Sequence, residues 1–371
     1  MIKVLYIMTH ATKSGPIQQM LNLIVNLDPT IFKAKLITVY EEDERLSVLQ
    51  QYLNVIEHEM IPTTKKQMMF GSIKNMRKAI QEFGPDVIHS FGVFPDYMVY
   101  RLGFKNHVFT CRNYVYDDYP DEYGKILGTV LAKIHLKAIK HTKNVRVCSE
   151  SLHDIYLKRL GLDIPFIRNG VDVSKFSFHT ETEKYQVRNS LGLSAEKIVC
   201  IYAGPFNGRK NQSFLLESII HNKSFQKLQI VLPGDGEELE KLKKEYESNT
   251  NVIFPGQVFN MPEYLAASDI YLSTSKSEGM PNGVLEAMSI GLPVILSDIE
   301  QHCEVLSVGE RCGLLYACND SKSFNKALDK MLNADFSSLG ENASKNARKY
   351  FSATSMSENY QSLYLQIYQN S

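Results

Sequence analysis

Long apolar runs are missing from this sequence of 371 residues. The apolar segment near the start, residues 2–8, is too short for a signal peptide or a membrane span and leads directly into a structured pattern. Low-complexity tracts and internal repeats are also missing. These absences argue against an integral membrane protein and a disordered chain, and we expect a folded protein in the cytoplasm.

Cysteine pairs are missing in the same way. The six cysteines form no C-x-x-C pair, and the nearest His and Cys, His302 and Cys303, are adjacent in sequence rather than spaced like metal ligands. We therefore expect reduced cysteines and no bound metal.

The chain also has no net charge, because 41 basic residues balance 41 acidic ones. Residues 1–170 nevertheless carry 22 Lys and Arg against 17 Asp and Glu, whereas residues 171–371 carry 19 against 24. The two halves thus have formal charges of +5 and −5. A basic first half weakly favours contact with an anionic membrane or a phosphate-bearing molecule, and nothing in the balance indicates a nucleic-acid partner.

The sequence does contain a repeated alternation of strand and helix patterns. Strands are predicted at residues 2–8, 35–39, 55–57, 86–89, 108–111, 145–148, 165–167, 197–203, 228–232, 252–254, 270–273 and 293–297. Helices are predicted after the Gly15-Pro16 turn and at residues 46–54, 72–83, 122–142, 211–221, 236–246, 261–267 and 282–290. This order predicts an α/β fold of parallel, doubly wound sheets.

The length predicts two domains, since 371 residues exceed one ordinary core. We expect an N-terminal Rossmann-like domain at residues 1–170, a second at residues 171–354, and a final helix at residues 355–371. The final helix carries an apolar and aromatic stripe that we expect to pack back on the first domain. The site is expected in a cleft between the two domains.

The most informative motif is the segment at residues 277–288, S-E-G-M-P-N-G-V-L-E-A-M. Pro281 suits the first turn of a helix, so the helix is predicted to begin there and to leave Glu278 in the preceding loop. Unpaired amides at a helix N-terminus bind phosphate, and here they are predicted to suit a diphosphate. These amides belong to Gly279, Met280, Asn282 and Gly283.

Two carboxylates flank this predicted phosphate site. Glu278 and Glu286 would lie roughly 12 Å apart along the axis of a continuous helix. This separation exceeds the roughly 5 to 9.5 Å of a glycosidase acid pair, so the carboxylates are better placed to hold hydroxyl groups on either side of a diphosphate. The spacing alone is more often that of two surface carboxylates, but the G-L-P-V-I segment at residues 291–295 and the surrounding motif favour a site.

These segments resemble the retaining glycosyltransferases of the GT-B fold, glycosyltransferase family four (glycosyl transferases group 1), over nearly the whole chain. The resemblance implies two Rossmann-like domains that face each other across a cleft. It also implies transfer of a hexose from a nucleoside-diphosphate sugar with retention of the anomeric configuration. A UDP-sugar is the favoured donor, and a GDP-sugar is the alternative. It implies a saccharide or lipid-linked saccharide acceptor in bacterial surface polysaccharide or lipopolysaccharide biosynthesis. It also assigns the donor sugar to Glu278 and the ribose to Glu286, with Gly279, Met280, Pro281 and Asn282 as donor-binding neighbours.

A second segment, residues 202–212, resembles the loop of the family that binds the donor diphosphate. Lys210 matches the lysine of that loop, whereas Pro205 stands where the family usually has an arginine. Arg209 could replace the missing cation, because a guanidinium binds phosphate bidentately. Gly234 and Val258 resemble donor-side loops more weakly, with Val258 contacting the base through its backbone.

The first domain matches the family at one position and differs from it at another. Gly15 matches the glycine loop that approaches the donor phosphates, but Arg112 stands where many members have a histidine. An arginine cannot act as a base, so Arg112 is expected to stabilise the leaving group or hold the acceptor, and together with Glu278 and Lys210 it is a catalytic candidate. His89, at the end of a predicted strand, is a second acceptor-binding candidate, although a single histidine more often has a structural role.

Residues 125–143 contain lysine as their only fully charged type and predict a basic amphipathic helix. Residues 65–71 are predicted to form an exposed basic and apolar loop in the same domain. Both features favour peripheral contact with anionic lipid on the inner face of the cell membrane, which brings a lipid-linked acceptor within reach. An ordinary helix with a solvated lysine face is an equally good explanation.

Other chemistries remain possible on the same scaffold. A nucleotide-sugar epimerase or hydrolase, or a catalytically silent sugar-binding relative, would share this fold, because fold does not fix chemistry. The sequence has no Asp-x-Asp triplet, which metal-dependent transferases of the single-domain type require, so we expect activity without a metal or another cofactor.

Overall fold

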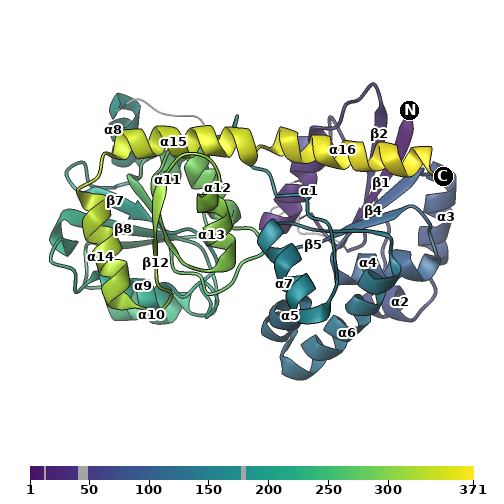
Figure 1. Cartoon of the computed structure of the whole chain (residues 1–371), viewed down its shortest axis with the longest axis horizontal. Coiled ribbons are helices and arrows are strands. Elements are labelled where there is room, and N and C mark those ends of the chain that lie inside the picture. Colours follow the sequence, from purple (N-terminus) through teal and green to yellow (C-terminus); the bar gives the residue numbers. More distant parts are fainter. Residues whose placement is uncertain (12–13, 41–48, 177–180) are drawn as a thin grey trace. The chain divides into compact units, whose positions relative to one another are not determined.

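The computed structural model describes residues 1–11, 14–40, 49–176 and 181–371. The chain forms two compact units (Figure 1). The first contains Met1–Gly170 together with Ala353–Ser371, and the second contains Val171–Ser352. The last helix therefore belongs to the unit that the first residues build.

A parallel sheet of six strands forms the centre of the first unit. Its order is β3-β2-β1-β4-β5-β6, so the direction of winding reverses between β1 and β4 as in Rossmann folds. The central strands are apolar and buried, because helices cover both faces. The strands are β1 (Ile2–Met8), β2 (Phe32–Thr38), β3 (Glu57–Met60), β4 (Val87–Phe91), β5 (His107–Cys111) and β6 (Asn144–Val147).

Several elements of this unit differ from their predicted boundaries. The helix predicted at residues 122–142 is two helices, α5 and α6, because Gly124 between them has φ +80°. The strand predicted at residues 165–167 is reduced to a single bridge between Val147 and Phe166. The helices are α1 (Gly15–Val25), the 3₁₀ helix η1 (Leu49–Tyr52), α2 (Lys65–Met69), α3 (Lys74–Phe83), α4 (Val93–Leu102), α5 (Val115–Tyr123), α6 (Lys125–His141), α7 (Glu150–Leu160) and α16 (Ala353–Gln369). The helix predicted at residues 46–54 lies partly outside the described residues.

The segment at residues 65–71 is exposed at Lys65, Lys66, Gln67 and Phe70 as predicted, but the prediction that it forms a loop is wrong. The segment forms the short helix α2, which begins with a capping box between Thr64 and Gln67. Met68 and Met69 are buried, because they point from this helix into the unit.

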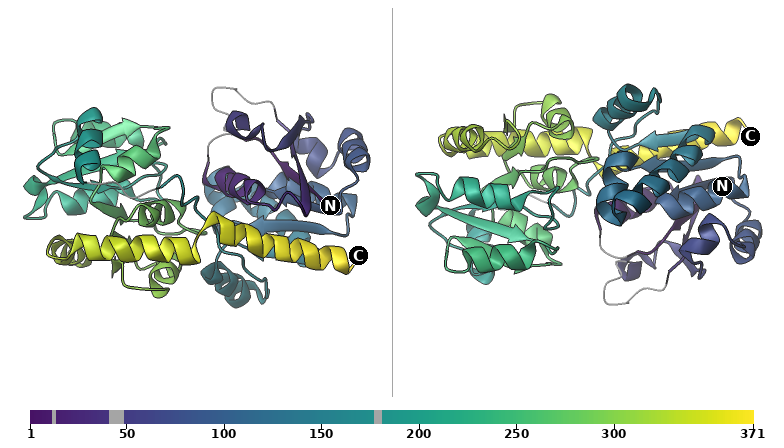
Figure 2. Two further views of the ribbon diagram at one scale, coloured as in Figure 1. Left: turned by 90° about the horizontal axis from the view of Figure 1, so that it is seen from above. Right: turned by 90° about the horizontal axis from the view of Figure 1, so that it is seen from below.

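The final helix, α16, closes the first unit. It packs against α1, as Figures 1 and 2 show. Its predicted apolar stripe is buried in the same core as Tyr6 and consists of Met356, Tyr360, Leu363, Tyr364 and Ile367. The helix thus supplies core side chains that the preceding part of the unit lacks.

The second unit repeats the same topology. Its parallel sheet has the order β12-β11-β10-β7-β8-β9, with the reversal between β7 and β10. The strands are β7 (Ile198–Ile201), β8 (Leu228–Pro233), β9 (Val252–Gly256), β10 (Ile270–Ser273), β11 (Val294–Ser297) and β12 (Gly313–Tyr316). The helices are α8 (Glu181–Ser190), α9 (Gln212–Ile219), the 3₁₀ helix η2 (Phe225–Lys227), α10 (Leu239–Tyr246), α11 (Met261–Ala266), α12 (Asn282–Ser289), α13 (Glu300–Ser307), α14 (Ser321–Leu332) and α15 (Phe336–Tyr350).

Candidate functional site

Two loops of the second unit bring the predicted donor-binding side chains together. Neighbouring strands β7 and β10 flank the point where the strand order reverses, and ligands of open α/β sheets bind beyond the carboxyl ends of strands at such a point. The loop after β7 carries Arg209 and Lys210, and the loop after β10 carries Glu278. The topology therefore joins residues that lie 68 or 69 positions apart in the sequence.

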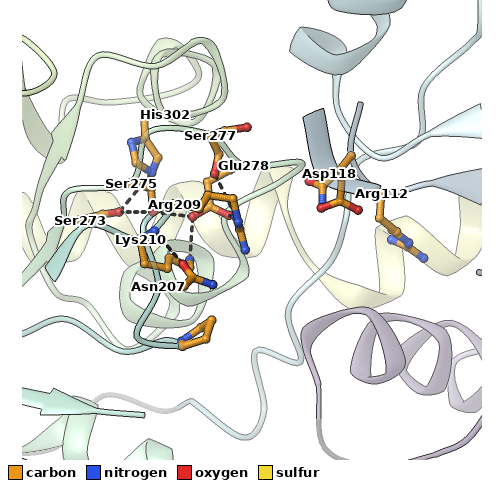
Figure 3. Close-up of polar contacts among 12 residues, drawn as sticks. Arg112, Asp118, Asn207, Arg209, Lys210, Ser273, Ser275, Ser277, Glu278 and His302 are labelled. Atoms are coloured by element: carbon orange, nitrogen blue, oxygen red, sulfur yellow. Dashed lines mark hydrogen bonds and ion pairs between the residues drawn. The ribbon is translucent and has the colours of Figure 1, made fainter. Parts of the chain in front are cut away.

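Glu278 is the centre of this cluster (Figure 3). Its side chain is 7% exposed, and its two carboxylate oxygens lie 2.6 Å from Lys210 Nζ and 2.9 Å from Arg209 Nη1. Burial on its own raises the pKa of Glu278, but the charges of Lys210 and Arg209 outweigh it and lower the pKa to about 2. Glu278 is therefore a carboxylate at neutral pH and has no proton to donate.

Arg209 lies beside Lys210 although it occupies a different place in the loop from the arginine of the family. Arg209 Nη1 also donates to the backbone oxygen of Ser277 at 2.9 Å, which fixes the guanidinium across the two loops. Pro205, at the position where the family has its arginine, is exposed. The structure thus places two cations together despite the substitution at Pro205.

The loop after β8 requires glycine at position 234. A Cβ atom at Gly234 would lie 2.0 Å from the backbone oxygen of Gly204, and Gly234 has φ +156°. The amide of Gly234 donates to the backbone oxygen of Gly256 at 2.9 Å. The loops after β7, β8 and β9 are therefore packed backbone against backbone, and Val258 follows two residues later in the last of them.

The start of α12 differs from the prediction. The helix begins at Asn282, one residue after the predicted Pro281, which has φ −79° and ψ 80°. The amide of Asn282 donates to the backbone oxygen of Met280 at 2.9 Å, which forms an inverse γ-turn around Pro281. The prediction that the amide of Asn282 is unpaired is therefore wrong. Gly279 and Met280 are buried, and Glu286 is half-buried on α12.

Sequence reasoning missed the hydroxyl groups beneath Glu278. Ser275 donates to Glu278 Oε1 at 2.6 Å, and Tyr202 OH lies 2.8 Å from Ser275 Oγ. His302 is also buried nearby, where burial lowers its pKa to about 4 and keeps it neutral. The hydroxyl residues Ser273, Thr274, Ser275 and Ser277, at the end of β10 and directly after it, were the signal that could have indicated this network.

Arg112 lies in the first unit, directly after β5. Its guanidinium carbon is 4.6 Å from the centre of the Phe91 ring, and Nη1 donates to Asn169 Oδ1. Arg112 Nε is buried and has no hydrogen-bond partner among the residues that the structure describes. The same part of the chain offers it no carboxylate within ion-pair distance, so it is a fixed cation with a spare donor.

His89 does not reach the surface. It is fully buried in β4, with Nδ1 2.6 Å from Tyr364 OH and Nε2 3.4 Å from Thr110 Oγ1. Burial and the charge of Arg112 hold the pKa of His89 well below its usual value, so it is neutral. These contacts support the structural explanation of His89 and give no support to a contact with an acceptor.

Gly15 is exposed and is the first residue of α1, whose N-cap is Ser14. Residues 12–13, which precede Ser14 and Gly15, lie outside the described residues. Within the ranges described, no group of three or more His, Cys, Asp and Glu side chains could hold a metal ion. None of the helices described is long and apolar enough to span a membrane.

Comparison with known proteins gives two family matches. The model of "Glycosyl transferases group 1" matches residues 183–350, and that of "Glycosyltransferase Family 4" matches residues 32–175. Among solved structures, sucrose-phosphate synthase from Thermosynechococcus elongatus has a TM-score of 0.81 at 19% identity, with 100% of both chains covered. Anabaena Alr3699/HepE in complex with UDP-glucose has a TM-score of 0.82 at 16% identity, with coverage of 99% and 100%. The chain has the GT-B fold, and its two halves match two glycosyltransferase family models.

The relatives that match parts of the chain are themselves named as glycosyltransferases. The UDP-Gal:alpha-D-GlcNAc-diphosphoundecaprenol alpha-1,3-galactosyltransferase of Escherichia coli is 33% identical over 206 residues, which cover 52% of this chain and 51% of that protein. The match thus spans about half the length of that relative. The capsular polysaccharide biosynthesis glycosyltransferase CapH of Staphylococcus aureus is 26% identical over 327 residues, with coverage of 82% and 84%.

Proposed function

We propose that this protein is a glycosyltransferase that moves a hexose from a UDP-sugar to a saccharide or lipid-linked saccharide, with retention of the anomeric configuration, during assembly of a bacterial surface polysaccharide. The observation that carries the proposal is the convergence of Lys210 and Arg209 on buried Glu278 at the reversal point of the second sheet. The UDP-glucose complex of the Anabaena protein and the UDP-Gal donor named for the Escherichia coli relative support the choice of base.

The two cations suit a diphosphate. Lys210 and Arg209 share one carboxylate, so the cluster retains one net positive charge to attract the donor. In the proposal both cations bind the diphosphate, and the remaining lone pair of Glu278, on Oε2, accepts a hydrogen bond from a hydroxyl group of the hexose. Glu286 takes the ribose, and Val258 contacts the base through its backbone.

The charge state of Glu278 supports a mechanism without an enzyme acid. In the proposed reaction, the bond between the anomeric carbon and the diphosphate oxygen breaks while the acceptor oxygen bonds to that carbon on the same face. The proton of the acceptor hydroxyl moves to the departing diphosphate. Lys210 and Arg209 stabilise the negative charge that develops on the leaving group.

Arg112 is proposed to hold an anionic group of the acceptor. Its ring contact and its bond to Asn169 fix the guanidinium, and the half-buried side chain places a positive charge where it can attract a phosphate group. The diphosphate of the acceptor named for the Escherichia coli relative is a group of this kind.

The amphipathic helix α6 is proposed to contact an anionic membrane on the cytoplasmic side. Ile126, Leu127 and Val130 are 86%, 55% and 47% exposed, although aliphatic side chains of this size are ordinarily covered. Exposed Lys125 and Lys133 lie on the same helix. This combination of aliphatic and basic side chains is typical of a helix at a lipid surface.

Calorimetric titration of the full chain with UDP, GDP, ADP and dTDP tests the donor site. We expect UDP to bind, and Lys210→Ala to weaken its binding at least tenfold by removing one charged contact to phosphate. An exposed cation outside the cluster, Lys227, serves as the control in Lys227→Ala. If no nucleotide binds the wild type, a catalytically silent relative becomes the better explanation.

Product analysis tests the reaction. Nuclear magnetic resonance of the product made from an α-linked UDP-sugar should show an α linkage, and turnover should require the acceptor. A β linkage would exclude retention. Conversion of the donor to an isomeric UDP-sugar without any acceptor would instead identify an epimerase.

A further inference from the structure

Two asparagines in the second unit have a backbone conformation that is rare for residues other than glycine. Asn211 has φ +58° and Asn319 has φ +60°, and no other non-glycine residue in the described ranges has a positive φ. They contact each other, because Asn211 Nδ2 donates to Asn319 Oδ1 at 2.9 Å. Asparagine tolerates this left-handed region better than most residues, but two such conformations joined by one hydrogen bond are an unusual arrangement.

Asn211 directly follows Lys210 in the donor loop. Its left-handed conformation ends the loop, and α9 begins at the next residue. Its side chain is buried, and its backbone oxygen accepts a hydrogen bond from Thr274 Oγ1 at 2.9 Å. The direction in which Lys210 leaves the backbone therefore depends on the turn that Asn211 makes.

Asn319 lies 108 positions later, in the exposed loop between β12 and α14. No motif of the sequence includes it. Its neighbour Asp320 caps α14 by accepting from the amide of Ser323 at 2.9 Å, which anchors the loop. The side-chain oxygen of Asn319 thus contacts the donor loop from a loop that the cap of α14 holds in place.

We propose that Asn319 is a positioning residue for the donor: by accepting the hydrogen bond from Asn211, it maintains the turn that directs Lys210 toward Glu278 and the diphosphate. Asn319 need not touch the donor itself. The inference rests on the proposed function of the loop that carries Arg209 and Lys210.

The test is a double-mutant cycle on the full chain, with UDP affinity measured by calorimetry for the wild type, Asn211→Gly, Asn319→Gly and the double variant. Glycine adopts a positive φ readily, so each substitution removes the amide and leaves the backbone conformation accessible. Each single variant should bind UDP about fivefold more weakly, the effect of one neutral hydrogen bond. The double variant should bind no more weakly than either single one, because both lose the same contact.

A matched control exists in the same unit. Asn222 Nδ2 donates to Asn325 Oδ1, also at 2.9 Å. Asn325→Ala removes this bond and the bonds from Asn325 Nδ2 to the backbone oxygens of Ser218 and Ser321, none of which lies in the donor loop. UDP affinity should be unchanged in Asn325→Ala. Unchanged affinity in both glycine variants, losses that multiply in the double variant, or an equal loss in Asn325→Ala would each overturn the inference. If the wild type itself fails to bind UDP, the donor-site proposal fails and takes the inference with it.

Discussion

Ser275 donates its hydroxyl hydrogen to Glu278 Oε1 across 2.6 Å, and both side chains are buried. The oxygen of Ser275 is in turn 2.8 Å from Tyr202 OH. Tyr202 OH also donates to the backbone oxygen of Lys210 at 2.8 Å, so this hydroxyl group contacts both donor-side loops. The bond from Ser275 helps to hold Glu278 beside Lys210 and Arg209.

Replacement of Ser275 should therefore impair the reaction. Ser275→Ala removes a hydrogen bond to a charged group, which is worth about 1.5 to 3 kcal/mol, so kcat/KM should fall roughly tenfold to a hundredfold. Initial rates with the donor varied would measure the loss. Ser273→Ala is the matched control, because Ser273 Oγ is 3.4 Å from Ser275 Oγ and does not touch Glu278. Equal losses in the two variants would contradict the specific role of Ser275.

Acid should destabilise the second unit through Glu278. The pKa of Glu278 is lowered from 4.5 to about 2 in the folded chain. The stability that ionised Glu278 provides is therefore complete above pH 4.5 and is lost as the pH falls toward 2. The pKa shift corresponds to a contribution to the free energy of unfolding on the order of 3 kcal/mol. The free energy of unfolding, measured by denaturant titration, should fall more steeply between pH 5 and pH 3 in the wild type than in Glu278→Gln.

Glu278→Gln should also be less stable than the wild type at pH 7, because Arg209 and Lys210 lose their carboxylate. The pKa of His302 is about 4 in the folded chain and 6.5 in the unfolded one, so His302 also favours unfolding as the pH falls from 6.5 toward 4. The charge of Glu278 raises the pKa of His302, so the difference between the two profiles reports Glu278 together with its effect on His302. Parallel pH profiles would mean that Glu278 is not held ionised by its cations.

Arg209 should carry part of the donor affinity. Arg209→Ala should weaken UDP binding at least tenfold, because it removes a charged contact to phosphate. Lys276→Ala is the control, since Lys276 is an exposed cation in the neighbouring loop. Pro205→Arg in the Arg209→Ala background should restore part of the affinity, because it returns a cation to the position that the family uses. A neutral effect of Arg209→Ala would remove Arg209 from the site.

Gly234→Ala should disrupt the packed loops. The added Cβ would lie 2.0 Å from the backbone oxygen of Gly204, so one loop must move. We expect a loss of about 3 kcal/mol or more, seen as a large drop in the melting temperature, together with weaker UDP binding. Gly208→Ala is the control, because a Cβ there meets no atom within 4 Å. Similar melting temperatures for the two variants would contradict the close approach.

The aliphatic side chains of α6 should determine binding to vesicles. The Ile126→Ser/Leu127→Ser variant should sediment less with vesicles that contain phosphatidylglycerol, because it loses apolar area while keeping every lysine. The matched control is Leu157→Ser, a similarly exposed leucine on α7 that is 46% exposed. The proposed membrane contact would be wrong if the wild type and the double variant sediment equally with the vesicles. It would also be wrong if the wild type does not sediment with them at low salt.

Local sequence patterns predicted the sheets, because strands and helix periods are encoded by near neighbours. The donor-binding roles of Lys210 and Arg209 came from the resemblance to the family. Glu278 and Lys210 follow neighbouring strands, so topology alone brought them together. The break at Gly124 was missed because the apolar period continues through it. The helix that begins at the capping box of Thr64 and Gln67 was predicted to be a loop, since five residues are too few to show the apolar period of a helix.

Contacts between distant segments could not be predicted in this way. His89 looked accessible because it ends a strand, but Tyr364 covers it from a helix 275 positions later. Asn211 and Asn319 are each ordinary loop residues in sequence, and only the fold places one against the other. Such pairs depend on which loops lie side by side in the fold, and a short stretch of sequence does not contain that information.

The position of α16 has a consequence for the order in which the chain acquires its structure. Tyr364 OH accepts a hydrogen bond from Tyr6 in β1, 358 positions before it, and lies 2.6 Å from His89 Nδ1 in β4. During synthesis the ribosome releases these partners first and α16 last. The first unit must therefore wait with an incomplete core while the whole second unit is made, so the unit that is translated later can finish folding earlier.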